Sequence, residues 1–538
     1  MVSKNKKARC KFVKKKLSIL LAMVMAVCCL TGLTACQKGG NGQAVPGVLT
    51  IRYYEGGYGS DWLKHALNDF AKENEGFKYS LVPDSTITNQ VTVYLESGKN
   101  LSDIYMIQGG NWAEWVSYGY LANLSDVYET EVETSKGKRK IKDYMDEDLV
   151  SRYYMQKYAG QGDYLPWVLP EASIMTSFAY NEEYLLSTTH TTTRAGRYTS
   201  GDKWTAPPET VEELLDYCAD LNARKDLGSN FAPFSWPGLE SHWLKFLLYT
   251  WFAQYQGAHE VNALNAATIA DEGSYYDFWN FASSEVWKMT GIQVAIDTLK
   301  SIFVGSGGSY KNSLAHVAEY SVQDAEKKFV AGESAMLVSG SFFYNEMKPY
   351  LDWKEDDGLP DYTFKMMYLP TIANAEKNED GSTKKMVFYS TDEIILVPAK
   401  ATNLDMAKKF LAYLFNEKNN LYFTQVSGTM RPFDYDPIAL SGDSYEWDPF
   451  TASVLDMYNS ADTRLYAYPA GRSVEDVSLI YRYKQPDIFG SQSWATYLNA
   501  IKKYTSEQIM ITGYGSEYKS VFDATKKDFS DWYYRYYE

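Results

Sequence analysis

Cysteine is scarce in this chain, which has five cysteines among 538 residues. Three of them lie before residue 36, so Cys36 and Cys218 are the only two that follow the N-terminal segment. Zinc and iron–sulfur sites built from several thiolates are excluded by this count. Disulfide bonds cannot supply much of the stability either, so the fold must depend on the size of its apolar core.

Positive charge is also in deficit. The chain has 53 Lys and Arg against 68 Asp and Glu, which gives a net charge of −15. The first 35 residues hold eight basic and no acidic side chains, so their removal changes the net charge to −23. Such an acidic chain repels phosphate groups, and a basic patch would be needed to bind nucleic acid. Nucleic acid is therefore excluded as a partner.

Several catalytic and cofactor motifs are absent. There is no Gly-x-Ser-x-Gly elbow, and the five histidines show no His-Glu-x-x-His spacing. Residues 97–100 (SGKN) lack the upstream glycine and the final hydroxyl residue of a Walker A loop, so any ATP must be hydrolysed by a separate partner. Residues 376–381 resemble a calcium loop, but Val387 stands where that loop needs a bidentate glutamate. We therefore expect neither a cofactor nor a metal.

The N-terminal segment combines a basic start with an apolar run. Eight basic residues lie in the first 16 positions, and the apolar residues 17–33 lead into the sequence Leu33-Thr34-Ala35-Cys36. This order predicts a secretory signal peptide over residues 1–35. A retained transmembrane anchor is the alternative, but a run of 17 residues is shorter than the roughly 20 that a spanning helix needs.

The end of this run resembles the bacterial lipobox, in which a cysteine receives a diacylglycerol before the leader is cleaved. The resemblance implies that Cys36 becomes the N-terminus and that its lipid anchors the protein to the outer face of the cell membrane. The alternative is a chance cysteine, like Cys28 and Cys29 within the apolar run. With Cys36 lipidated, Cys218 has no partner for a disulfide. Residues 36–47, rich in glycine, are predicted to form a flexible tether.

Beyond the tether, strand-like and helix-like patterns alternate. Apolar runs at residues 48–54, 104–107, 335–338 and 394–397 are typical of strands that are buried on both faces. Helical periods separate these runs, as between residues 321 and 332, where Ser321 is placed to cap a helix and Gly332 to end it. The alternation predicts an α/β protein with mostly parallel sheets, divided into two to four lobes.

Five segments in order carry a family resemblance. The most specific is residues 325–347, AEKKFVAGESAMLVSGSFFYNEM, with a helix, a Gly-x-x-Ala-Met strand and a Gly-Ser-aromatic turn. The other four begin at Ser102, Tyr164, Pro207 and Thr391. Together they resemble the extracellular solute-binding proteins of ABC importers, in particular the carbohydrate-binding group that includes maltose-binding protein. The five segments span most of residues 48–432.

The resemblance implies a periplasmic-binding-protein-like fold, in which two α/β lobes are joined by a hinge and the ligand lies in the cleft between them. The N-terminal lobe is then expected to comprise residues 48–165 and about 336–390. The C-terminal lobe is expected to comprise residues 166–335 and about 391–480. Residues 481–538 form a C-terminal extension that the resemblance assigns to neither lobe.

The same resemblance implies which loops line the cleft. Planar rings stack on the apolar faces of pyranose sugars, while Glu, Gln and Asn side chains bond to hydroxyl groups. The expected ligand-binding residues follow strands or lie in turns and in the hinge: Tyr54, Glu55, Gln108, Asn111, Trp112, Trp167, Glu171, Trp236, Ser341 and Phe342. Each has an alternative role in packing. Trp115 and Trp243, which fall within helical periods, are expected in the core.

The function that the resemblance implies is that of a lipid-anchored receptor. It captures a carbohydrate, here expected to be an oligosaccharide, by hinge closure and delivers it to an ABC permease with a separate ATPase. We expect a monomer without enzymatic activity.

Two alternatives stay open. The same fold can bind a peptide or another non-sugar solute. A cell-surface glycosidase needs two carboxylates about 5–10 Å apart, and 68 acidic residues hide any such pair. The block at residues 325–347 favours the receptor.

Overall fold

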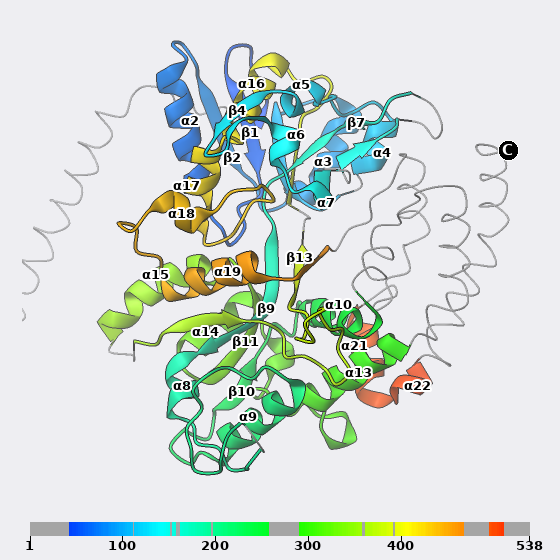
Figure 1. Ribbon diagram of the computed structural model, residues 1–538. Coiled ribbons are helices and arrows are strands. Elements are labelled where there is room, and N and C mark those ends of the chain that lie inside the picture. The colour runs from blue at the N-terminus through cyan, green and yellow to red at the C-terminus, as the bar shows by residue number, and fades with distance from the viewer. Residues whose placement is uncertain are drawn as a thin grey trace, which may run out of the picture.

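The structure is a computed structural model, which describes residues 42–110, 112–150, 153–157, 162–194, 197–257, 290–357, 361–390, 393–466 and 494–509. Within these ranges the chain forms two lobes, one above the other in Figure 1, each built on its own β-sheet. No helix in these ranges combines the length and the apolar character that crossing a bilayer requires.

The first lobe is built on a mixed sheet with the strand order β2-β1-β3-β14-β8. Its strands are β1 (Leu49–Tyr53), β2 (Tyr79–Pro83), β3 (Ile104–Gln108), β8 (Val168–Pro170) and β14 (Glu393–Leu396). β1 is parallel to β2 and β3, whereas β14 is antiparallel to β3 and β8. All five residues of β1 are buried, as expected for a strand that is covered on both faces. The main helices of this lobe are α2 (Asp61–Glu73), α3 (Ile87–Ser97), α16 (Leu404–Leu414) and α17 (Glu417–Ser427).

The second lobe is built on a mixed sheet with the order β10-β11-β9-β13-β15, with β12 paired to β9. Its strands are β9 (Ile174–Asn181), β10 (Ala232–Ser235), β11 (Ser334–Gly340), β12 (Phe364–Met367), β13 (Met386–Ser390) and β15 (Thr463–Tyr466). Its helices include α9 (Val211–Ala223), α10 (Trp243–Gln256), α13 (Thr290–Phe303), α14 (Val322–Val330), α15 (Phe343–Asp357) and α19 (Pro449–Ser460). Antiparallel pairs in both sheets mean that the expectation of mostly parallel sheets holds only in part.

Shorter elements decorate the two sheets. In the first lobe these are α4 (Trp112–Ser117), α5 (Ser125–Tyr128), β4 (Glu131–Thr134), β5 (Gly137–Lys140), α6 (Ile141–Tyr144), α7 (Glu147–Val150), β6 (Tyr154–Met155) and β7 (Leu165–Pro166). Elsewhere they are α8 (Glu182–Ser187), the 3-10 turns Ser306–Gly308 and Val317–Glu319, α18 (Pro437–Ser441), α21 (Trp494–Lys503) and α22 (Ser506–Gln508). The predicted helix after Ser321 is confirmed: Ser321 and Asp324 form a reciprocal capping box.

Among the described residues, the chain passes between the lobes at three places. β8 continues into β9, β13 is followed by β14, and α17 of the first lobe leads to α19 beside β12. The backbone N–H of Ser173 donates to Met430 O at 2.9 Å, and that of Glu171 donates to Glu393 O at 2.8 Å. These bonds tie the three connections together, so they form one hinge.

A buried arginine holds this hinge to the first lobe. Arg431 is fully buried; its Nε donates to Glu171 O at 3.1 Å and its Nη1 to Asn420 Oδ1 at 3.1 Å. Its guanidinium carbon lies 4.6 Å from the ring centre of Trp62 and 4.4 Å from that of Phe423. Burial lowers the pKa of Arg431 to about 10, so the group still carries its charge at neutral pH.

The lobe boundaries differ from those expected. The strands β11, β12 and β13, between residues 334 and 390, belong to the second sheet, whereas β14, α16 and α17 belong to the first lobe. This is the reverse of the expected assignment of residues 336–390 and 391–480, although α19 and β15 do return to the second lobe. The apolar runs look alike in either sheet, so the pattern does not reveal which neighbour each strand pairs with. Within the C-terminal extension, α21 and α22 pack against α13 of the second lobe.

The predicted tether is shorter than expected. From residue 42 onward the chain is held against the first lobe: Ala44 N donates to Leu101 O at 2.7 Å, and Gly47 N donates to Asn403 Oδ1 at 2.8 Å. The glycine content of this segment predicted flexibility, but its backbone N–H groups form hydrogen bonds with residues that are distant in the sequence. Residues 36–41, with Cys36, lie outside the described residues.

The burial of Glu171 generates a prediction about pH. Burial raises the pKa of Glu171 from 4.5 to about 8, so the native state keeps a proton that the unfolded chain releases between these values. The stabilisation from this proton is present below about pH 4.5 and is lost as the pH rises toward 8. Urea titrations at several pH values measure the free energy of unfolding. Between these pH values Glu171 lowers it by up to ~1.4 kcal/mol per pH unit, and Glu171→Gln is expected to remove this fall. The exposed variant Glu446→Gln should follow the wild type, and equal slopes in all three proteins contradict the prediction.

Candidate functional site

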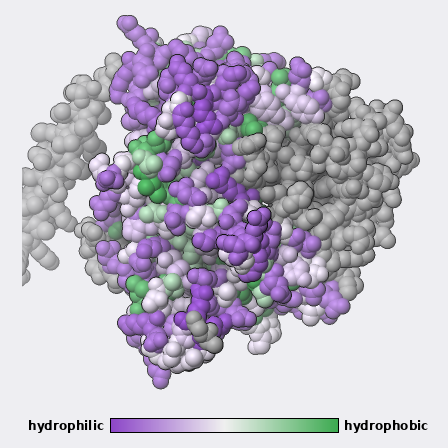
Figure 2. Space-filling model, in the orientation of Figure 1, coloured by the Kyte–Doolittle hydropathy of each residue, from purple (hydrophilic) through white to green (hydrophobic). Residues whose placement is uncertain are grey.

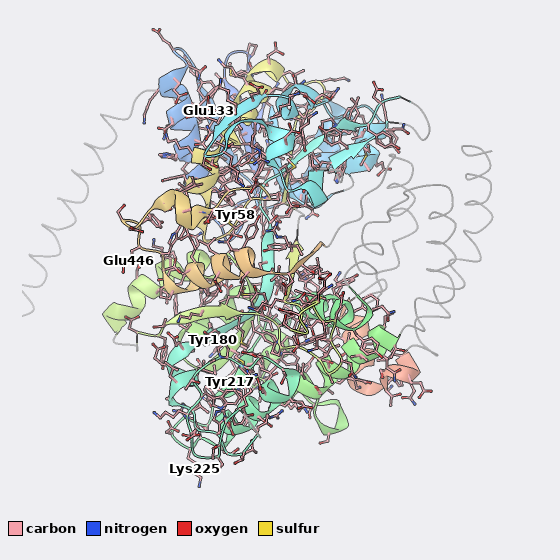
Figure 3. The ribbon with its side chains drawn as sticks, viewed as in Figure 1. Tyr58, Glu133, Tyr180, Tyr217, Lys225 and Glu446 are labelled. Carbon is pink, nitrogen blue, oxygen red and sulfur yellow. The ribbon has the colours of Figure 1, made fainter. Side chains whose placement is uncertain are left out.

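A cavity of about 550 Å³ lies between the two lobes. From the first lobe it is lined by the loop after β1, the end of β3 and the start of β14. From the second lobe it is lined by β9, the chain around the start of α10, α14, α15 and the end of β13. Figure 3 labels Tyr58, one of the lining residues, at the waist between the lobes. The outer surface seen in Figure 2 is mainly hydrophilic over both lobes.

Aromatic rings from both lobes form part of the cavity wall. Trp243 is half-buried at the start of α10, and its ring centre lies 5.8 Å from those of Phe246 and Phe342. Tyr54 and Tyr58 come from the loop after β1 on the other side. Burial raises the pKa of both tyrosines, so both hydroxyls keep their protons at neutral pH. The wall therefore offers flat apolar faces together with hydroxyl groups.

Three glutamates supply the main polar groups of the wall. Glu393, at the start of β14, accepts a hydrogen bond of 3.4 Å from Gln108 Nε2. Glu346, on α15, accepts one of 3.3 Å from Gln323 Nε2, and burial raises its pKa. Glu240 precedes α10. After burial, the charges of Glu346 and Glu393 also raise the pKa of Tyr54, so both carboxyl groups lie near its hydroxyl.

The two lobes touch at the edge of this cavity. Asn345 Nδ2 donates to Gly57 O at 2.8 Å, across the cleft. A Cβ atom on Gly57 would lie 2.5 Å from the Phe342 ring and 2.6 Å from a carboxylate oxygen of Glu346. Only glycine permits this close approach of the loop after β1 to the second lobe.

Tyr58 connects the cavity to the hinge. It lines the cavity and is almost fully buried, and its hydroxyl donates a hydrogen bond to the carboxyl group of Glu171. The backbone oxygen of Glu171 accepts a hydrogen bond from Arg431 Nε. A contact made at Tyr58 is therefore one residue away from the hinge.

Three of the ten expected ligand-binding residues line the cavity, namely Tyr54, Gln108 and Phe342. Asn111 lies outside the described residues. Glu55 accepts a hydrogen bond from Ser60, beside the cavity, and Trp112 packs against the core of the first lobe.

The other four are placed in the interior. Trp236 is fully buried in the core of the second lobe, and its Nε1 donates to Ser313 Oγ at 3.0 Å. Trp167 is buried in the first lobe just before β8, and its Nε1 donates to Met155 O at 3.1 Å. Ser341 is buried, with its hydroxyl bonded to that of Thr429, and Glu171 is buried behind Tyr58. These four side chains therefore lie in the interior and are not part of the cavity wall.

Sequence reasoning missed several residues of the cavity wall. The cavity is also lined by Tyr58, Glu240, His242, Trp243, Phe246, Gln323, Glu346 and Glu393. Trp115 is buried in the core as expected, whereas Trp243 is half-buried: it packs against the apolar core and also lines the cavity. A signal for Trp243 did exist, because the first turn of a helix that follows a strand lies near the crevice of an open α/β sheet.

A family model described as bacterial extracellular solute-binding protein matches residues 65–434 of the chain. No curated protein sequence matches it. Among solved structures, a solute-binding protein from Thermotoga lettingae bound with α-D-tagatose has a TM-score of 0.58 and 13% identity, over 88% of this chain and 99% of that chain.

Two other solved structures are similar to this chain. RafE in complex with raffinose has a TM-score of 0.53 and 14% identity, over 89% of this chain and 98% of that chain. A mannobiose complex from Bifidobacterium animalis has a TM-score of 0.53 and 13% identity, over 91% and 97%. At these identities the likeness establishes a shared two-lobed fold.

The different places of two tryptophans predict different effects on stability. Trp236→Ala removes a fully buried ring and is expected to lower the free energy of unfolding by about 3–5 kcal/mol. Trp243→Ala removes a half-buried ring and is expected to cost about 1–2 kcal/mol. Urea unfolding followed by circular dichroism measures both values, and similar losses for the two variants would contradict this placement.

Proposed function

Because the chain belongs to the family of bacterial extracellular solute-binding proteins, we propose that it captures a carbohydrate, an oligosaccharide, in the cavity between its lobes. The observation that carries this proposal is the cavity wall, in which aromatic rings stand beside amide and carboxyl groups from both lobes. Such rings stack on sugars while the polar groups bond to hydroxyls. Three structures of the same fold hold raffinose, tagatose and mannobiose, which supports a sugar.

The mechanism that we propose is closure about the hinge. A ligand that contacts Gln108 of one lobe and Trp243 of the other gains both contacts only when the lobes are close together. Binding therefore shifts the population toward the closed form. An ABC permease then recognises this form, and a separate subunit hydrolyses ATP. The receptor acts as a monomer and as a binding protein rather than an enzyme.

We also propose that a lipid on Cys36 anchors the receptor to the outer face of the cell membrane. The described chain begins at Gly42 against the first lobe, so residues 36–41 connect the lipid to the folded part. A tethered receptor stays at a high effective concentration near its transporter.

Calorimetric titration with a panel of plant, host and storage oligosaccharides tests the ligand class. We expect one-to-one binding of an uncleaved glycan, and a loss of affinity of at least about ten-fold in Trp243→Ala, because a stacking ring contributes roughly 1–3 kcal/mol when it is desolvated. The matched control is Tyr118→Ala, which removes an exposed ring away from the cavity. Cleavage of the glycan would support an enzyme instead, and no binding across the panel would favour a non-sugar solute.

The lipid anchor has its own test. Cys36→Ala is expected to release the protein from the membrane fraction while the affinity for the ligand stays unchanged, because Cys36 precedes the folded lobes. Fractionation and immunoblotting measure the first effect, and titration measures the second. A variant that stays in the membrane fraction would argue for a retained transmembrane segment.

A further inference from the structure

The described side chains that line the cavity between the lobes include carboxyl groups but no lysine or arginine. Its glutamates, Glu240, Glu346 and Glu393, come from three different elements. Among the described residues that line it there is neither lysine nor arginine. The remaining basic group, His242, has its pKa lowered to about 4 by desolvation and by Lys245, so it is neutral at physiological pH. On the described part of the wall, the ionised side chains that a ligand meets are therefore carboxylates.

Two polar atoms of the wall are buried and lack a hydrogen-bond partner among the described residues. One is Oγ1 of Thr176 on β9, a residue that is 2% exposed. The other is Oε2 of Glu240. Both residues line the cavity. A buried polar atom without a partner is costly, so both atoms point to a ligand that supplies hydrogen bonds there.

The carboxyl groups are not arranged for a metal ion. Within the part of the chain that the structure describes, no group of three or more His, Cys, Asp and Glu side chains converges as metal ligands. Their charges are instead spread around a cavity of about 550 Å³ with aromatic faces between them. Spread carboxylates beside aromatic rings suit an organic cation, because an ammonium group donates hydrogen bonds to carboxylates and is attracted to ring faces.

We propose that the ligand of this cavity is a glycan that carries a free ammonium group, as in a deacetylated amino sugar, and that Glu240 and Glu346 select it. This inference rests on the proposed function, since it names the class of sugar. The sugar ring stacks on Trp243 or Tyr54, and its ammonium donates to the carboxylates. A glycan that carries a carboxylate is repelled by the same groups.

Matched disaccharides test the proposal. The disaccharide backbones have the gluco, galacto or manno configuration. Each is prepared in four forms: with a free amine, an N-acetylated amine or a hydroxyl at carbon 2, and with a carboxylate at carbon 6. The full-length protein is titrated with each at pH 6, where the amine is protonated. For at least one backbone, we expect the free-amine form to bind at least ten-fold more tightly than the hydroxyl form, and the carboxylate form to be the weakest.

Glutamine variants show which groups select the amine. Glu240→Gln and Glu346→Gln keep the shape of the side chain and remove its charge, so each should reduce the preference for amine over hydroxyl at least five-fold. Glu446→Gln is the matched control, because Glu446 is exposed and lies at the outer edge of the view in Figure 3. Its preference should equal that of the wild type.

The outcomes separate this inference from the proposed function. If hydroxyl or N-acetylated forms bind as tightly as free amines, the protein is a sugar receptor and the inference is wrong. If a lysine-rich tripeptide or a polyamine binds and no sugar does, the cavity selects a cationic ligand that is not a carbohydrate. Both proposals are then wrong. If nothing binds, both also fall. A preference that survives in both glutamine variants overturns the role given to these side chains.

Discussion

The buried guanidinium of Arg431 is the interaction on which the arrangement of the two lobes depends. It lies where the third connection between the lobes begins, and it reaches the first connection through Glu171 O and the helices of the first lobe through Leu414 O and Asn420 Oδ1. A fully buried charge is stable only where hydrogen bonds and neighbouring groups compensate for lost water. Here backbone oxygens and aromatic faces do so, which fixes the hinge to the first lobe.

The wall of the cavity is connected to this hinge through Glu171. Glu171 follows β8, and its side chain accepts a hydrogen bond from Tyr58, whose ring lines the cavity. Because Glu171 holds Arg431 through its backbone and Tyr58 through its side chain, the wall and the hinge share one residue. In the closure that we propose, movement of the lobes changes the surroundings of Tyr58, and a ligand that contacts Tyr58 lies one residue away from the hinge.

The sequence predicted the fold better than the site, for a physical reason. The block at residues 325–347 combines a capped helix, a buried strand and a turn, and the structure contains α14, β11 and the turn before α15 in that order. Strand partners were misassigned because burial on both faces looks the same in either sheet. The tryptophans show the same limit: Trp236 and Trp243 both follow β10, yet one ring points into the core and the other into the cleft. Side-chain direction depends on tertiary packing, which residue type and spacing do not encode.

The hinge and the cavity contain side chains of opposite charge beside aromatic rings. At the hinge, the cation of Arg431 lies against the rings of Trp62 and Phe423, and its hydrogen bonds are made within the chain. In the cavity, carboxylates lie beside rings such as Tyr54 and Trp243, and no lysine or arginine among the described residues shares the wall. Rings and carboxylates together form the environment that a cation prefers in a desolvated site. The hinge shows that this chain can stabilise a cation against aromatic faces, and in the cavity the same combination leaves the positive charge to the ligand.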